Sequence, residues 1–212
     1  LSKHPAFYPA EGRDFTGRPN VVGTLPGDPS ARSLLFNGHV DTIPFTPVGD
    51  WSFNPLSGEL KDGRILGRGS SDMKGGLAAM TMALKTLLDT DLRPRGSVIL
   101  EYVMDEEVSG LGTLACVMRG YKADAGISLE TSDLEVQPAC IGRLWFVVEV
   151  KGKPAGISRR WEAINALDKG YELSKAIEEL EAERVRTLSH PLFPDPRGAM
   201  PCAVRQFEAG PY

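Results

Sequence analysis

One imidazole and a set of carboxylates stand at positions along the sequence where they could bind a metal. His39 and Asp41 are two residues apart, directly after an apolar run, so both side chains can point the same way. A metal-bound imidazole usually donates its second N–H to an orienting partner, and Asp41 is the candidate for that partner. Taken alone, a His-x-Asp sequence is more often an ordinary polar turn.

Asp72 stands between a glycine-rich stretch and a segment with helical spacing. For this residue alone, capping of the helix is the better explanation. The glycines before it, however, are typical of backbone that approaches a ligand closely. A phosphate-binding loop is excluded, because Lys74 is followed by glycine rather than by serine or threonine.

Three successive carboxylates, Asp105, Glu106 and Glu107, follow another apolar run. Charges of one sign this close together repel one another unless cations are present. Adjacent residues project in different directions, so one carboxylate can bind a metal while its neighbour faces a water molecule. Metal-assisted hydrolysis needs that division between a Lewis acid and a separate base. A solvated acidic turn explains the segment equally well when it is considered alone.

Glu130 ends a further apolar run and would alone be an ordinary surface residue. Considered jointly with the other sites, it completes a set of one imidazole and several carboxylates without a thiolate. Such a set is typical of a catalytic rather than a structural zinc site. Two metals about 3.5–4 Å apart could share Asp72 as a bridging ligand.

The elements that position these residues alternate between strands and helices. We predict strands at residues 20–25, 33–37, 97–103 and 125–129, and helices at residues 73–88 and 110–119. The alternation predicts an α/β fold with a mainly parallel sheet flanked by helices. In such sheets ligands bind beyond the carboxyl ends of the strands, which is where His39, Asp105–Glu107 and Glu130 fall.

After residue 140 the pattern changes. Residues 143–151 alternate between apolar and polar like a strand, residues 161–186 have the spacing of a long charged helix, and residues 202–207 suit a further strand. We therefore place a domain boundary near residue 140.

Composition excludes several classes of protein. The 212 residues carry a net charge of −4, which gives no basic surface for nucleic acid. The sequence has no apolar run of the roughly 20 residues that a membrane span needs. Three widely spaced cysteines fit neither a disulfide framework nor a zinc ribbon, so a reducing cytoplasmic location is expected.

Three segments, residues 34–44, 67–76 and 105–107, together resemble the dinuclear zinc aminoacylase and carboxypeptidase family. That family includes acetylornithine deacetylase, succinyl-diaminopimelate desuccinylase, aminoacylases, glutamate carboxypeptidase and several di- and tripeptidases. The resemblance implies a metal-dependent amidohydrolase or metallopeptidase with two Zn²⁺ ions in each active site, for which Co²⁺ or Mn²⁺ can substitute.

The resemblance also implies a role for each site residue. His39, Asp72 and Glu130 would hold one zinc, and Asp72 and Glu107 would hold the other. Asp41 would orient the site, and Glu106 would be the general base that passes a proton to the leaving amine. The peptide bond between Asp72 and the residue after it would be cis.

By the same resemblance, residues 1–140 would be the amino-terminal part of a zinc-peptidase-like catalytic domain. Residues 141–212 would be an incomplete, inserted α+β lid domain through which homodimers form. We expect the remaining part of the catalytic domain, with a histidine ligand for the second zinc, to lie outside this chain. His4 and His190 are interpreted as structural or surface residues.

Two further expectations concern the lid and the substrate. The family's lid carries a histidine that residues 152–158 lack, and we expect that residues are missing from the sequence at that point. Glu130 in place of aspartate resembles the deacylases, which favours an N-acyl amino acid as substrate. The alternatives are a di- or carboxypeptidase of the same family, or a non-catalytic binding protein built on this scaffold.

Overall fold

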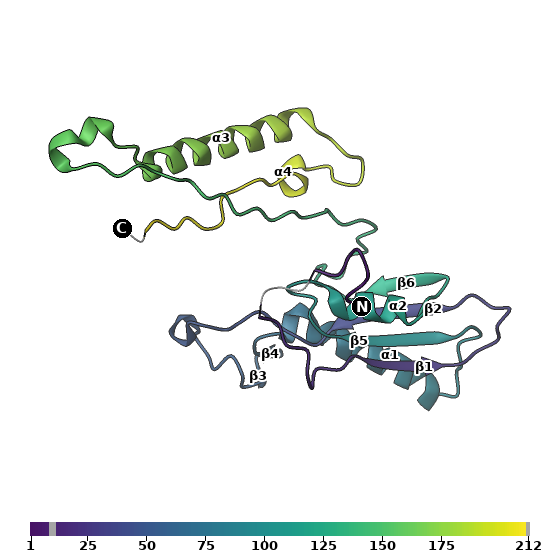
Figure 1. The fold of residues 1–212 in the computed structure, drawn as a ribbon. Helices are drawn as coiled ribbons and strands as arrows, with labels where there is room; N and C mark the ends of the chain where they lie inside the picture. Colours follow the sequence, from purple (N-terminus) through teal and green to yellow (C-terminus); the bar gives the residue numbers. More distant parts are fainter. Residues whose placement is uncertain (9–11, 211–212) are drawn as a thin grey trace. The chain divides into compact units, whose positions relative to one another are not determined.

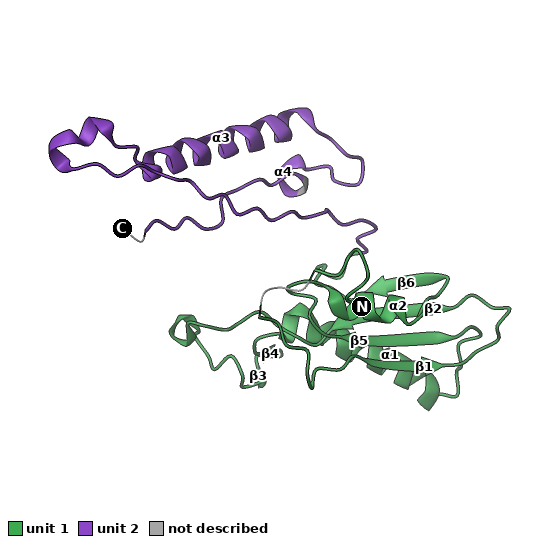
Figure 2. Cartoon of the chain, viewed as in Figure 1, with its two compact units in different colours: residues 1–135 green, residues 136–212 purple. Residues whose placement is uncertain are grey.

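The computed structural model describes residues 1–8 and 12–210 and divides the chain into two units, residues 1–135 and 136–212 (Figure 2). The division lies close to the boundary expected near residue 140. That the two units are a catalytic part and a lid stays a prediction.

The first unit is built on a four-stranded sheet in the order β1-β5-β2-β6 (Figure 1). Its strands are β1 (Val21–Leu25), β2 (Leu34–His39), β5 (Val98–Val103) and β6 (Ala125–Ser128). Strand β2 pairs in parallel with both β5 and β6, whereas β1 is antiparallel to β5. The mainly parallel sheet predicted from the alternation of elements is therefore confirmed.

Helices α1 (Gly75–Asp89) and α2 (Leu111–Met118) cover the sheet. Leu77 and Met80 of α1 pack on Val98 and Leu100 of β5, and these four side chains form the hydrophobic core of the unit. Side chains on a strand alternate between the two faces, so Glu101 points away from α1. It lies on the side of α2, where Asn37 binds its carboxylate.

A hairpin of β3 (Glu59–Lys61) and β4 (Arg64–Leu66) lies between β2 and α1, where we predicted no strand. Asp62 and Gly63 join its strands, both with positive φ. An Asp-Gly pair is a strong hairpin signal, so this element was predictable. A short 3-10 helix, η1 (Val48–Asp50), precedes it.

The second unit is mainly helical. It contains η3 (Ile157–Glu162), α3 (Ala166–Thr187) and α4 (Pro196–Ala199). The helix predicted over residues 161–186 begins later, because Asn165 caps it by accepting a hydrogen bond from the Leu167 N–H at 3.1 Å.

The strands predicted at residues 143–151 and 202–207 are wrong, and an α+β lid is not evident in residues 136–210. A strand needs a neighbour to complete its hydrogen bonds, and within this part of the structure no ladder forms with either segment. The apolar side chains of residues 144–148 consequently face solvent, and Val147 is 100% exposed.

Lys153 and Ile164 exchange two backbone hydrogen bonds of 2.9 Å and close the loop between them. That residues are missing from the sequence at this point stays a prediction. No helix in the described part of the chain combines the length and apolar character that a bilayer crossing requires.

Candidate metal centre

The carboxyl ends of three parallel strands bring the predicted site residues together. His39 is the last residue of β2 and pairs with Val103 at the end of β5. Asp105, Glu106 and Glu107 follow β5, and Glu130 follows β6. The edge of the sheet therefore assembles side chains that are far apart in the sequence.

His39 is held in one orientation by the chain just after it. Its side chain is 0% exposed, and its Nδ1 lies 2.9 Å from the backbone oxygen of Asp41. A carbonyl oxygen can only accept a hydrogen bond, so Nδ1 must carry a proton. In the neutral ring the lone pair is then on Nε2, which faces the carboxylates. This is the arrangement in which a histidine binds a metal through Nε2.

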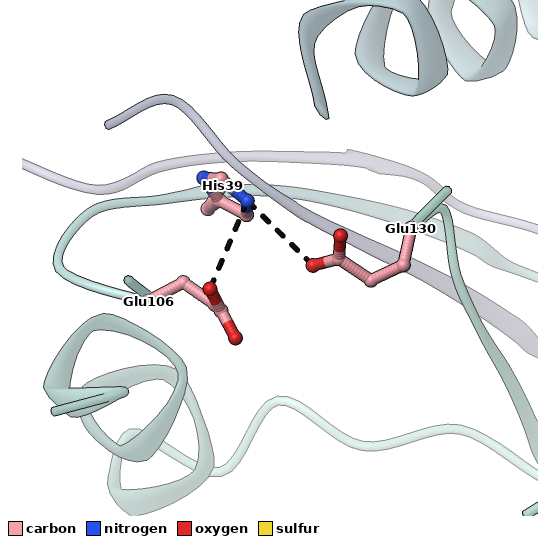
Figure 3. A group of neighbouring side chains, drawn as sticks. All are labelled: His39, Glu106 and Glu130. Carbon is pink, nitrogen blue, oxygen red and sulfur yellow. Dashed lines mark ion pairs between the residues drawn. The ribbon is translucent and has the colours of Figure 1, made fainter. Parts of the chain in front are cut away.

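Three carboxylates converge on that nitrogen. The Nε2 atom of His39 lies 3.0 Å from Oδ1 of Asp72, 3.6 Å from Oε1 of Glu130 and 3.8 Å from Oε2 of Glu106. Figure 3 shows Glu106 and Glu130 reaching the ring from separate parts of the chain. Two groups have ligand atoms within 4.8 Å of one another: His39 with Glu106 and Glu130, and His39 with Asp72 and Glu107.

The electrostatics of this cluster favour a cation. Burial lowers the pKa of His39, but the bond to the Asp41 carbonyl, the bond to Asp72 and the nearby carboxylates outweigh burial, so the net shift is upward. With Nδ1–H already donated, a hydrogen bond between Nε2 and Asp72 at 3.0 Å needs one further proton between these two atoms. That proton stands where a metal ion would bind.

Two of the carboxyls also have raised pKa values. Burial is the largest cause for both Glu106 and Glu130, and neighbouring carboxylates add to it, while His39 acts in the opposite direction. Positive charge at this point would relieve the repulsion among the acidic groups. The donor set of one imidazole and several carboxylates fits Zn²⁺.

Asp72 is positioned by an irregular turn before α1. Gly69 has φ +82°, and the peptide bond between Asp72 and Met73 is cis, as the family resemblance implies. Met73 is fully buried, and its sulfur accepts a hydrogen bond from the backbone N–H of His39 at 3.1 Å. A Cβ on Gly38 would lie 2.7 Å from Cε of Met73, so the methionine packs directly against the backbone at this glycine.

Asp41 serves the acidic segment as well as the histidine. Its Oδ1 accepts a hydrogen bond from the backbone N–H of Glu106 at 3.2 Å, and its Oδ2 accepts one from the N–H of Glu107 at 3.3 Å. Residues Asp41, Glu106 and Glu107 are thereby fixed relative to one another. Sequence reasoning selected Asp41 as an orienting residue but did not anticipate that its carboxylate binds this backbone.

Asp105 belongs to the acidic run 105–107 and was assigned no role of its own from the sequence. It is the residue of that run whose side chain is buried. Its side chain is fully buried, with Nε of Arg13 3.6 Å away and the Ser109 hydroxyl bonded to it. Its φ is +66°. No sequence signal links Arg13 to this position, because the two are brought together only by the fold.

The other two histidines lie outside both ligand groups. His4 accepts a hydrogen bond from the Ala6 N–H, and His190 accepts one from the Leu192 N–H in the second unit. Within the described residues, a second metal beside Asp72 and Glu107 would therefore share the single imidazole of His39.

The profile of Peptidase family M20/M25/M40 matches residues 35–205. The N-formyl-4-amino-5-aminomethyl-2-methylpyrimidine deformylase of Bacillus subtilis is 43% identical over 58% of this chain and 29% of its own length. The deformylase of the same name from Halalkalibacterium halodurans is 36% identical over 85% of this chain and 45% of its own length. The succinyl-diaminopimelate desuccinylase of a Bradyrhizobium strain is 41% identical over 51% of this chain and 30% of its own length. The chain thus spans less than half the length of these relatives.

Proposed function

Because the chain belongs to Peptidase family M20/M25/M40, we propose that the protein containing it is a zinc-dependent hydrolase of N-acyl amide bonds. The observation that carries the proposal is the convergence of three carboxylates on Nε2 of His39, while Nδ1 is held by the Asp41 carbonyl. The names of the relatives support the reaction, since deformylases and desuccinylases both remove an acyl group from nitrogen.

The proposed metal ligands are His39, Asp72 and Glu130 at one zinc position, and Asp72 and Glu107 at the other. When bound, zinc acts as a Lewis acid at a carbonyl oxygen and makes water a nucleophile at neutral pH. Asp72 would be shared by both positions, as the family resemblance implies; its Oδ1 lies 3.0 Å from Nε2 of His39, and it belongs with His39 and Glu107 to one of the two ligand groups.

Glu106 is the proposed general base. Burial raises the pKa of its carboxyl, which brings the group closer to the neutral pH at which a base must both accept and release a proton. Its carboxylate takes a proton from the attacking water and delivers that proton to the leaving nitrogen. The backbone of Glu106 is anchored on Asp41, so its side chain can face the reacting water without losing its place.

A small N-acyl compound is the proposed substrate, either an N-acyl amino acid or an N-formyl amine of the kind named for the deformylases. Residues 141–212 are proposed to form part of a lid through which the protein dimerises, as the family resemblance implies. Sedimentation of the full-length protein tests dimerisation: a monomer at micromolar concentration would contradict it.

The activity is tested with the full-length protein, stripped of metal and reloaded with zinc. Turnover is measured on N-formyl-4-amino-5-aminomethyl-2-methylpyrimidine, an N-succinyl amino acid, N-acetyl amino acids and dipeptides. We expect acyl release that disappears with the metal and returns with zinc. Cleavage of dipeptides alone would show a peptidase, and equal turnover by metal-free protein would overturn the proposal.

Matched histidine variants locate the metal. His39→Ala should abolish zinc binding, whereas His190→Ala should leave it unchanged because His190 lies outside the site. Zinc bound with full affinity by His39→Ala would overturn the assignment. Full metal content without turnover on any member of the panel would instead favour a non-catalytic binding protein.

A further inference from the structure

The proposed base and a proposed ligand stand on residues 104–112, which comprise the loop after β5 and the first two residues of α2 and which we call the acidic loop. It connects β5, which ends at Val103, to α2, which begins at Leu111. Inside the loop, the backbone oxygen of Asp105 accepts hydrogen bonds from the N–H groups of Ser109 at 3.2 Å and Gly110 at 2.7 Å. These bonds fold the loop on itself but do not attach it to the rest of the sheet.

The side chain of Asn20 spans the neck of this loop. Its Oδ1 accepts a hydrogen bond from the backbone N–H of Met104 at 3.1 Å. Its Nδ2 donates to the backbone oxygen of Gly112 at 2.7 Å and contacts Sγ of Cys116 at 3.4 Å. One carboxamide therefore binds both ends of the loop, with its acceptor on one and its donor on the other. Asn20 directly precedes β1, so the neck is tied to the neighbouring strand.

The backbone at the neck is closely packed. A Cβ on Gly112 would lie 2.0 Å from the backbone oxygen of Met104 and 3.0 Å from Oδ1 of Asn20. Met104 and Gly112 are both buried. Without Asn20, the buried Met104 N–H has lost the acceptor that the fold provides.

Loss of the two Asn20 hydrogen bonds, which together clamp the neck, would change the positions of the Glu106 and Glu107 carboxylates. Glu106 is two residues from Met104, and its position depends on the direction in which the chain leaves β5. The bonds from Glu106 N–H and Glu107 N–H to Asp41 are 3.2 and 3.3 Å long. Without the clamp, the loop would be held by these two longer bonds, by the Ile43 N–H bond to Oε1 of Glu107 at 3.3 Å and by Arg13 beside the buried Asp105, and its carboxylates would take a wider range of positions.

We propose that Asn20 is a positioning residue that fixes Glu106 and Glu107 by clamping the neck of the acidic loop. The inference rests on the proposed function, since the clamp matters for chemistry only if these carboxylates serve a metal and a water. Asn20 binds backbone groups at the neck and makes no hydrogen bond to His39 or to any carboxylate of the site.

The test compares Asn20→Ala with Tyr102→Phe in the full-length protein. Tyr102→Phe removes the 2.6 Å bond between the Tyr102 hydroxyl and Thr81, on the same strand but away from the loop. Hydrogen exchange of residues 104–112 reports the clamp, and Co²⁺ titration of metal-free protein, followed by its visible absorption, reports the site. Both are measured well below the unfolding temperature, and exchange of the amides within β5 reports any change in global stability separately.

We expect Asn20→Ala to speed exchange of the Met104 amide at least tenfold, because that buried donor loses its partner. Co²⁺ affinity should fall roughly 10- to 100-fold, as is typical when an outer partner of a metal ligand is removed. Tyr102→Phe should change neither quantity. Asn20→Asp keeps the acceptor but not the donor, so the Met104 amide should stay protected while Co²⁺ affinity falls.

Unchanged Co²⁺ affinity and spectrum in both Asn20 variants would overturn this inference and leave the proposed function intact. Wild-type protein that binds no Co²⁺ would overturn the proposed function and this inference with it. If Asn20→Ala does not fold, Asn20→Asp alone decides between these outcomes.

Discussion

Gly76→Ala should damage the site more than it damages the fold. Gly76 is in the first turn of α1, where a Cβ would lie 2.3 Å from the backbone oxygen of Leu129 and 2.9 Å from its Cβ. Ordinary contact begins near 3.4 Å, so helix and strand end must separate by about 1 Å. Asp72 precedes this helix and Glu130 follows Leu129, so the separation pulls two proposed ligands apart.

The two effects of Gly76→Ala can be compared in magnitude. Overpacking against backbone costs about 1–3 kcal/mol of folding free energy. Alanine regains about 1 kcal/mol in a helix relative to glycine, so the net loss of stability is only about 0–2 kcal/mol. A displacement of 1 Å at reacting groups can cost about 100-fold in rate. Activity should therefore fall far more than the folded fraction does.

The assay measures urea unfolding, zinc affinity and turnover of full-length Gly76→Ala beside Gly126→Ala. Gly126 lies in β6, where a Cβ would meet only the Leu35 oxygen at 3.8 Å. Gly126→Ala should retain zinc affinity and turnover. Wild-type zinc affinity and turnover in Gly76→Ala would refute the reasoning that close packing of α1 on residue 129 sets the spacing of the ligands.

Other perturbations test single residues of the site. Glu106→Gln should retain zinc but lose about 10²- to 10⁴-fold in turnover, whereas Glu107→Gln should also lose metal; normal metal content and turnover in both would contradict the assigned roles. Asp41→Asn replaces one of the two acceptor oxygens that bind Glu106 N–H and Glu107 N–H, so zinc affinity should fall about 10-fold or more while the protein stays folded by circular dichroism. The metal-free protein should lose stability as pH rises above the ordinary carboxyl range and then through the range of histidine, because Glu106, Glu130 and His39 have raised pKa values and their protonated forms favour the folded state. Zinc affinity should rise as pH rises through the range of His39, because zinc competes with the proton on Nε2. Urea unfolding of the metal-free protein and calorimetric titration with zinc, each repeated across this pH range, test the expected fall in stability and the expected rise in affinity.

The sheet edge of the site could be predicted from sequence because its signals are local. Apolar runs marked β2 and β5, and the helical spacing after Asp72 marked α1. Parallel strands place their carboxyl ends together, so the meeting of His39 with Glu106 and Glu130 followed from topology.

The second unit was predicted less well because strands depend on distant partners. Residues 143–151 alternate as a strand should, but a period of two records only which side chains share a face. It does not supply the neighbouring strand, and the segment remains extended without a ladder. Helix α3, whose hydrogen bonds are internal, was found with its start displaced to Ala166.

The contacts that fix the acidic loop were not predictable. Asn20 is separated from Met104 and Gly112 by more than 80 residues, and it reads in sequence as an ordinary residue before a strand. The proximity of Arg13 to Asp105 and the role of Gly112 likewise arise only when the neck closes. Residues of this kind are identified from their hydrogen-bond partners and close contacts in the structure, because no sequence motif marks them.

The central claim is that Nε2 of His39 and the carboxylates around it bind zinc. Anomalous diffraction at the zinc edge from crystals of the zinc-loaded, full-length protein tests it most directly. We predict a peak about 2.0–2.2 Å from Nε2 of His39 and from carboxylate oxygens of Asp72 and Glu130. A peak bound through Nδ1, or zinc located only away from this sheet edge, would contradict the account.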